Sequence, residues 1–363
     1  MKQPKKIKKP KLPKVKLSRE LRRVRSAEQK VSDALSTVPR ITNETVSEHR
    51  EEVLAGARKY IYPLQHSKHH IVRISVGLFA VVIISFFVLF SLSLYKFQST
   101  SGFTYNVTRI VPFPVAKAGS SWVSYESYLF ELRRNMHYYQ TQQQANFISK
   151  DGKQQLKRLK EQALAQVIQD AYVKQLASQN HVSVSEEQVN NQVTLVRSQN
   201  RLGDSERVFR VVLNEFWGWK EADFKRELKQ ELLQQAVVAK LDDGTTAKAH
   251  AALQQLVNGA DFGSLATQVS DDLGTKAAGG QYPRPLTMRD SDLSPVLAQE
   301  IFRLKPGETS SLINTGYTLD IVKVTDATDS TRHAAHIQFT FQDITTYVKP
   351  LQAKNPPHDY IKV

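Results

Sequence analysis

The sequence predicts an α+β protein in which a single transmembrane helix precedes an all-helical region and an antiparallel sheet with helices. Three patterns carry this prediction. The run from Ile74 to Tyr95 holds no charged residue, residues 122–242 repeat apolar side chains at helical spacing, and residues 245–342 place helices before several strand-like runs. Helices followed by strands within one small segment are typical of α+β domains with an antiparallel sheet.

Charge is distributed unevenly along the chain. The formal net charge is +15, but residues 1–73 alone hold 19 Lys and Arg against 7 Asp and Glu, a net charge of +12. A Lys- and Pro-rich segment that precedes an apolar run favours attraction to anionic lipid over binding to nucleic acid. We therefore expect a basic, disordered tail over residues 1–70 and no nucleic-acid partner.

The uncharged run predicts a transmembrane helix over residues 71–96. Its 22 residues, Ile74 to Tyr95, would form a helix about 33 Å long, which is enough to cross a hydrocarbon core of about 30 Å. Every face is apolar, and Tyr95 lies at the edge as an interfacial anchor. Because the basic residues precede this helix, the N-terminus is expected in the cytoplasm and the C-terminal domains outside the cell membrane.

Beyond this helix, composition and capping signals divide the chain further. Residues 97–121 are rich in Ser, Thr, Gly and Pro and are expected to form a linker with one strand-like piece. In the helical domain expected over residues 122–242, Ser124 can cap the first helix, and Ser185 followed by Gln188 forms a capping box. We expect residues 343–363 to form a C-terminal tail.

Two parts of the chain resemble known families. The later segment resembles parvulin-type (PpiC) peptidyl-prolyl isomerases in the order of its motifs: NGADFGSLATQVSDD, AAGGQ, AQEIFRLKPGETSSLINTGY and DIVKV. The helical region is similar to the N-terminal chaperone region of SurA-like and PrsA-like foldases in its segments VSYESYLFELRRN, VSVSEEQV and WGWKEADFKRELKQELL. Together the two resemblances span roughly residues 105–341. They imply a membrane-anchored extracytoplasmic foldase that assists exported proteins.

The implied reaction sets what the site must contain. A prolyl peptide bond rotates over a barrier of about 18–20 kcal/mol, and uncatalysed exchange takes tens to hundreds of seconds. No bond is made or broken, so we expect neither a cofactor nor a metal, and the absence of cysteine excludes thiolate chemistry. The implied partners are unfolded or exported polypeptides with proline-containing segments.

The resemblance places an apolar cradle for the proline ring on the helix after the Gly-Gly motif. Leu293 and Leu297 stand where the family has a Met and a Phe, and Phe302 lies behind them. Both positions stay apolar in this sequence, but leucine replaces the aromatic side chain that lines the family's cradle. The alternative interpretation is that both leucines only pack the core.

The resemblance also implies a polar cluster that favours the twisted imide. Asp272 of the SDD motif matches the family's Asp or Cys, and Thr315 approximately matches its Ser or Thr hydroxyl. Asp320 stands where the last strand of the family carries a His, and one residue is inserted there. The catalytic prediction is weakened by this departure.

The family's first strand, which carries a second His, is missing from its usual place. Upstream of the motifs the chain runs from helix to helix, whereas HAAHIQFTF at residues 333–341 follows the strand expected at 317–324 after a short turn. Such a strand can pair antiparallel with its predecessor. We predict a circularly permuted domain in which His336 rejoins the polar cluster. The alternatives are a lone edge strand and the start of a truncated second rotamase domain.

The sequence therefore supports two functions. The first is an isomerase-like foldase whose site has diverged from the family. The second is a non-catalytic holdase or envelope scaffold that keeps the rotamase fold as a peptide-binding module, since one His and both cradle residues are replaced.

Overall fold

The computed structural model describes residues 27–36, 42–61, 64–198 and 205–363. These residues belong to two compact units, Met1–Val88 and Leu89–Val363, which we describe separately.

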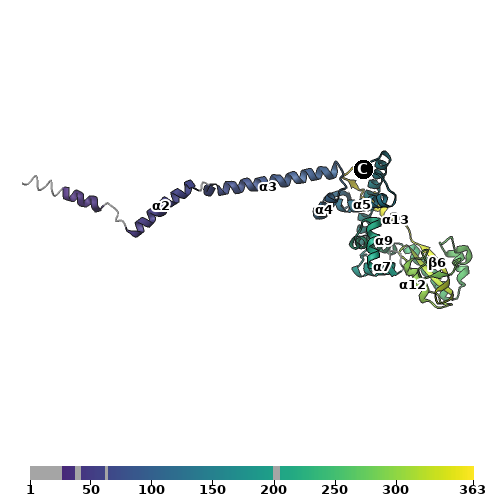
Figure 1. The fold of residues 1–363 in the computed structure, drawn as a ribbon. Helices are drawn as coiled ribbons and strands as arrows, with labels where there is room; N and C mark the ends of the chain where they lie inside the picture. Colours follow the sequence, from purple (N-terminus) through teal and green to yellow (C-terminus); the bar gives the residue numbers. More distant parts are fainter. Residues whose placement is uncertain (1–26, 37–41, 62–63, 199–204) are drawn as a thin grey trace, which may run out of the picture. The chain divides into compact units, whose positions relative to one another are not determined.

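The first unit is helical in its described part. It contains a helix over residues 27–36, α2 (Asn43–Ile61) and most of α3 (Leu64–Tyr95), which continues into the second unit (Figure 1). An acidic first turn and a basic last turn suit the dipole of α2. The structure thus describes helices at residues 27–36 and 43–61, where a disordered tail was expected, and residues 1–26 of that tail lie outside the described residues.

The apolar run forms a helix of membrane-spanning length. Residues His70–Tyr95 of α3 are 26 residues long and almost all exposed. Within the described residues, this helix alone is long and apolar enough to cross a membrane. The uncharged run identified from the sequence lies entirely inside it.

The predicted helical region lies in the second unit. Ser124 accepts a hydrogen bond from the backbone nitrogen of Ser127 at 3.1 Å, and Ser185 and Gln188 exchange the two hydrogen bonds of a capping box. Both predicted caps are confirmed. The helices that follow from this patterning are α5 (Tyr125–Gln142), α6 (Lys150–Gln179), α7 (Glu186–Ser198), α8 (Glu206–Trp217) and α9 (Glu221–Leu241).

Residues 97–121, expected as a linker, are folded instead. Ser101 caps a helix by accepting a hydrogen bond from the backbone nitrogen of Thr104, and Val115 is fully buried in a strand. The Ser- and Thr-rich composition that indicates a loop thus supplies a helix cap. The elements are α4 (Gly102–Ile110), β1 (Pro114–Ala118) and β2 (Ser121–Ser124), with β1 and β2 antiparallel.

Residues 343–363, expected as a tail, also fold. They form α13 (Thr345–Lys354) and β7 (His358–Asp359), and β7 pairs antiparallel with β1. The Tyr172 hydroxyl donates to the Asn355 carbonyl at 2.5 Å, and Ile361 is 3% exposed in the core. The end of the chain therefore returns to the helical domain, and the sheet described next is inserted within that domain.

The second sheet has four antiparallel strands in the order β3-β6-β5-β4. Strand β6 lies between β3 and β5, so the predicted central place of the 333–341 segment is confirmed and the lone edge strand is wrong. The pairing of β5 with β6 extends from Thr318 opposite Thr340 to Ala327 opposite Arg332. The strands are β3 (Leu286–Thr287), β4 (Ile313–Asn314), β5 (Thr318–Ala327) and β6 (Thr331–Thr340).

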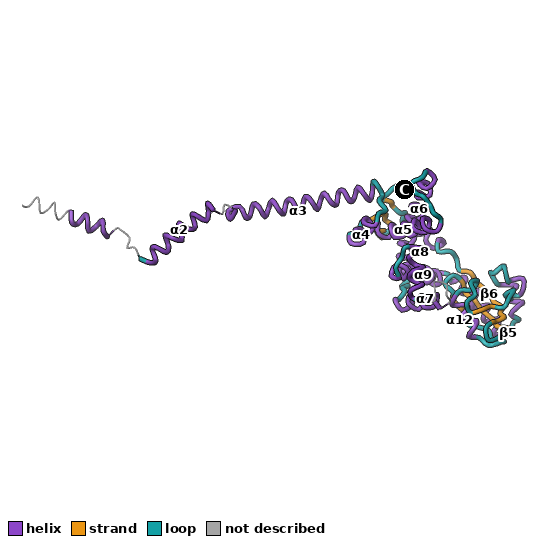
Figure 2. The backbone as a smooth tube through the Cα atoms, viewed as in Figure 1, coloured by secondary structure: helices purple, strands orange, loops and turns teal. Residues whose placement is uncertain are grey.

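Helices cover both faces of this sheet, as the tube view shows around β5 and β6 (Figure 2). Ala335 and Ile337 of β6 pack on the side of α10 (Asp243–Val257) and α11 (Phe262–Val269), while Ala334 packs on the side of α12 (Pro295–Arg303). The sequence of a strand that is covered on both faces is continuously apolar, whereas a strand with one solvent-facing side alternates apolar and polar residues. This explains why AAHI is buried at four consecutive positions.

The return of the chain to the helical domain predicts a stability effect at the C-terminal end. Ile361→Ala should lower the free energy of unfolding of the full chain by about 2–5 kcal/mol, because it leaves a cavity in the core. Denaturant unfolding followed by circular dichroism measures this change. The matched control, Ile148→Ala, removes the same atoms from a side chain that is 84% exposed, and should change it by less than about 0.5 kcal/mol. Equal effects of the two substitutions would show that the C-terminal residues are not part of the core.

Candidate functional site

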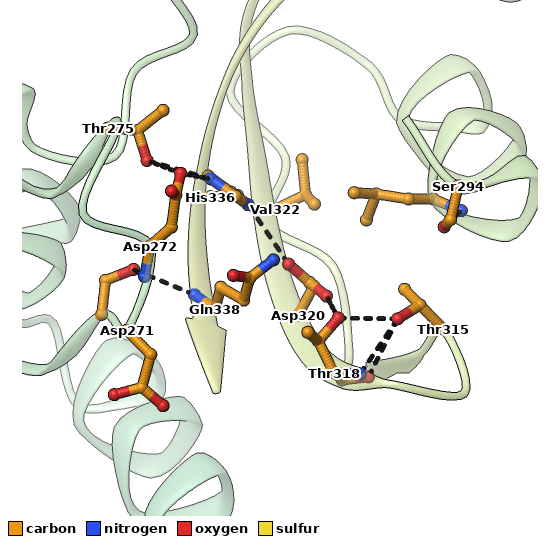
Figure 3. A network of polar contacts seen from close by, with 12 residues as sticks. Asp271, Asp272, Thr275, Ser294, Thr315, Thr318, Asp320, Val322, His336 and Gln338 are labelled. Atoms are coloured by element: carbon orange, nitrogen blue, oxygen red, sulfur yellow. Dashed lines mark hydrogen bonds and ion pairs between the residues drawn. The ribbon is translucent and has the colours of Figure 1, made fainter. Parts of the chain in front are cut away.

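A histidine held between two carboxylates lies across the central strands of the sheet (Figure 3). The Nε2 atom of His336 is 2.8 Å from Asp272 Oδ2, and its Nδ1 atom is 3.2 Å from Asp320 Oδ1. Both ring nitrogens can donate only when the imidazole is protonated, so the geometry fits an imidazolium. Among the described residues, no group of His, Asp and Glu is placed to hold a metal ion.

Threonine hydroxyls extend this network at both ends. Thr275 donates to Asp272 at 2.5 Å and lies 3.0 Å from the Nε2 atom of His336. At the other end, Thr318 donates to Asp320 at 2.5 Å and lies 2.6 Å from the Thr315 hydroxyl. The structure therefore brings Asp272, His336, Asp320 and Thr315 into one network. Thr315 lies at its far end, and the hydroxyl beside His336 belongs to Thr275.

The first two residues of the SDD motif hold Asp272 against β6. Ser270 accepts a hydrogen bond from the backbone nitrogen of Gln338 at 3.2 Å, and the backbone nitrogen of Asp271 donates to the Gln338 carbonyl at 2.7 Å. The Asp271 carboxylate accepts from the backbone nitrogen of Thr340 at 2.9 Å. These three bonds fix the loop after α11, and they direct the Asp272 side chain toward His336.

The Gly-Gly motif brings its backbone against the same strand. The backbone nitrogen of His336 donates to the Gly280 carbonyl at 2.8 Å, and Gly280 has a φ of +79°. A Cβ atom at position 280 would lie 2.2 Å from the His336 carbonyl oxygen, so only glycine fits. Two residues later, Tyr282 stacks on the His336 ring with centroids 4.6 Å apart. The segment that follows the Gly-Gly motif therefore covers the His336 ring.

Burial and charge together set the protonation of the network. Burial alone would lower the pKa of His336, but the hydrogen bonds and charges of Asp320 and Asp272 outweigh it and raise that pKa. For Asp272, burial raises the pKa, while hydrogen bonds from Thr275 and His336 outweigh burial and lower it. The His336 side chain is 4% exposed and that of Asp272 is 28% exposed. Of these two side chains, Asp272 is therefore the more accessible to solvent.

The residues expected to form the proline cradle lie in the core beneath α12. Leu293 is 3% exposed and Leu297 is 5% exposed, and both pack with residues of the sheet such as Val322. Phe302 is half-buried at the edge of the same cluster, with the Arg332 guanidinium 4.8 Å from its ring centroid. These positions agree with the packing interpretation, and the cradle role of the three residues stays a prediction.

The sequence reasoning missed three members of the site. Thr318 lies two residues before Asp320 on one strand face, a spacing that could have indicated its contact. Thr275 follows Asp272 by three residues across a turn, and Tyr282 follows the Gly-Gly motif, but nothing local shows that either contacts His336. Both contacts depend on His336 of β6, which lies more than fifty residues further along the chain.

The second sheet is antiparallel, has helices on both faces and is crossed at its centre by a His–Asp network. This fold and site define a rotamase-type domain, which is attached to a helical domain. Comparison with known families agrees: residues 232–326 match the PPIC-type PPIASE domain, and residues 64–238 match the SurA-like N-terminal domain. The chain therefore carries a PPIC-type rotamase domain after a SurA-like N-terminal domain. The rotamase match ends before β6, the strand that completes the sheet.

Individual proteins give weaker similarities. Comparison with curated proteins gives no match. Among solved structures, the foldase protein PrsA from Streptococcus pneumoniae str. Canada MDR_19A is 17% identical over 52% of this chain and 75% of its own, with a TM-score of 0.17.

Because the pKa of His336 is raised, we expect its substitution to lower the stability of the fold by an amount that depends on pH. The imidazolium stabilises the fold fully below the unfolded pKa of about 6.5, and this contribution is lost as pH rises through the higher folded pKa. His336→Gln should therefore lower the melting temperature most near pH 6, and the difference from the wild type should narrow as pH rises through the folded pKa. Thermal unfolding of the full chain across this range measures it.

The matched control lies on the same strand. His333→Gln changes an exposed histidine three residues earlier and should leave the pH profile unchanged. The imidazolium assignment would be wrong if His336→Gln lowered the melting temperature equally at all pH values. It would also be wrong if His333→Gln gave the same pH profile of melting temperature as His336→Gln.

Proposed function

We propose that the chain is a membrane-anchored extracytoplasmic foldase whose rotamase domain accelerates rotation of prolyl peptide bonds in unfolded or exported polypeptides. One observation carries this proposal: Asp272, His336 and Asp320 form a continuous hydrogen-bonded network across the centre of the sheet. The loop after α11 supplies Asp272, and the β5–β6 hairpin further along the chain supplies Asp320 and His336. The partially exposed end of the network is a carboxylate, Asp272, which a polypeptide can reach.

Rotation about the imide bond requires loss of its resonance, which places partial negative charge on the carbonyl oxygen in the planar state. A carboxylate beside that oxygen disfavours the planar state more than the twisted one, and this differential interaction lowers the barrier. Asp272 has this role in the proposal. His336 and Asp320 act through it as positioning residues, and Thr275 holds the reactive carboxylate oxygen from the other side.

A second candidate function is favoured by the burial of the cradle. Leu293 and Leu297 lie in the core, and Tyr282 covers His336, so the proline ring has no exposed apolar surface on these residues. A non-catalytic holdase that uses the rotamase fold as a peptide-binding module needs no such surface. The two candidates differ in a single measurable property, the acceleration of prolyl rotation.

Isomerisation of a short proline-containing peptide by the full chain in detergent tests the catalytic proposal. The wild type should accelerate exchange, and Asp272→Asn should lower kcat/KM at least about tenfold, because it removes the charge while keeping the shape. The matched control, Asp329→Asn, changes an exposed aspartate in the β5–β6 turn and should have no effect.

Two outcomes would count against the catalytic proposal. Equal activity of Asp272→Asn and the wild type would remove Asp272 from the mechanism. A wild type that suppresses aggregation of an unfolded client without accelerating exchange would establish the holdase function instead.

The membrane anchor in this proposal is supported by the apolar helix His70–Tyr95 and by the basic residues that precede it, which suit contact with anionic lipid. The chain contains no cysteine, so an introduced one is a unique label site. In intact cells stripped of any outer barrier, a membrane-impermeant maleimide should label Ile148→Cys but not Val31→Cys, both exposed positions. Labelling of Val31→Cys in sealed cells would overturn the proposed orientation.

A further inference from the structure

A second feature of the described residues is a groove of about 790 Å³ between α7, α9, α12 and the β4–β5 turn. Its volume lies in the range of ligand-binding clefts. Among the described residues that line it none is charged, and it is rich in side-chain amides: Gln188, Asn191, Gln192, Gln235, Gln299 and Asn314. We call it the amide groove.

Three of these amides have no partner of their own in the described part of the chain. The side chains of Asn191, Gln192 and Gln299 make no hydrogen bond or ion pair there. Each carries both a donor and an acceptor, as a peptide bond does. Such side chains can bind the backbone of an extended polypeptide without selecting its sequence.

Apolar side chains between the amides limit what the groove can hold. Val184, Leu195, Leu232 and Val296 line it together with the amides. A charged occupant would lose part of its hydration to the apolar side chains and would find no opposite charge among the described lining residues. The lining therefore fits an extended, uncharged polypeptide segment, and it offers no cationic side chain to a phosphate, a nucleic acid or an acidic lipid headgroup.

The amide groove is held close to the His–Asp network. Thr315 lines the groove and also begins the hydrogen-bonded chain that leads to Asp320. At the next residue Gly316 has a φ of +95°, and a Cβ atom there would lie 2.3 Å from the Gln235 side chain. The Tyr317 hydroxyl donates to Glu231 of α9 at 2.7 Å, which fastens this turn to the helical domain.

We propose that the amide groove binds an extended, uncharged segment of a client polypeptide through its backbone, beside the rotamase network. This proposal rests on the proposed function, since it assumes that the chain binds unfolded polypeptides. It adds the place of binding, the chemical class of the segment and the absence of charge selection. Proline is not required in the bound segment.

Binding of fluorescent peptides to the full chain in detergent tests the proposal. The probe is a capped, proline-free peptide of Ala, Thr and Asn, and a second probe of equal length alternates Lys and Glu. Gln192→Ala combined with Gln299→Ala should weaken binding of the uncharged probe at least about fivefold, because two amide partners are lost. Affinity for this probe should not change between about 50 and 500 mM salt.

The matched control is Gln154→Ala combined with Gln162→Ala, which removes two exposed amides from α6 outside the groove and should leave binding unchanged. Equal melting temperatures of both double variants confirm that folding is retained. Unchanged binding by the groove variant, tighter binding of the charged probe or strong salt dependence would overturn the proposal. Failure of the wild type to suppress client aggregation or accelerate prolyl exchange would instead overturn the proposed function.

Discussion

The charged pairing of His336 with Asp272 and Asp320 is the interaction on which the rotamase domain depends. It joins the loop after α11 to the two central strands, and all three side chains lose most of their water. A neutral histidine could donate to only one of the two carboxylates, so the other would remain buried without that partner. The imidazolium therefore links the two central strands through Asp320 and holds Asp272 against β6.

The order of strands along the chain has a consequence for the whole second unit. Because β6 follows β5 through a short turn, the central pair of the sheet is a hairpin of strands that are neighbours in sequence, and the loop with Asp272 packs against it. The chain afterwards returns to the helical domain, where β7 pairs with β1 and Ile361 enters the core. The rotamase domain is thus tied to the helical domain at both of its ends, which suits a protein in which both domains contact one client.

Access to the network is narrow. Tyr282 covers the His336 ring, Leu293 and Leu297 are buried beneath α12, and Asp272 alone of the charged triad is partly exposed. The amide groove is open and uncharged by comparison, and it ends at Thr315 of the same network. In the two proposals made above, binding of a polypeptide and rotation of its prolyl bond therefore use different surfaces.

The sequence by itself determined what local chemistry decides: the helical periodicity, the caps at Ser124 and Ser185, the membrane-length helix and the order of the family motifs. It also showed that a strand was missing upstream, which placed β6 and His336 correctly. Only the tertiary structure decided that Thr275 and Tyr282 contact His336, that the leucines are buried, and that the C-terminal residues form a strand beside β1. These features are contacts between distant segments, and the local pattern of a short or polar segment carries no signal of the partner that it meets in the fold.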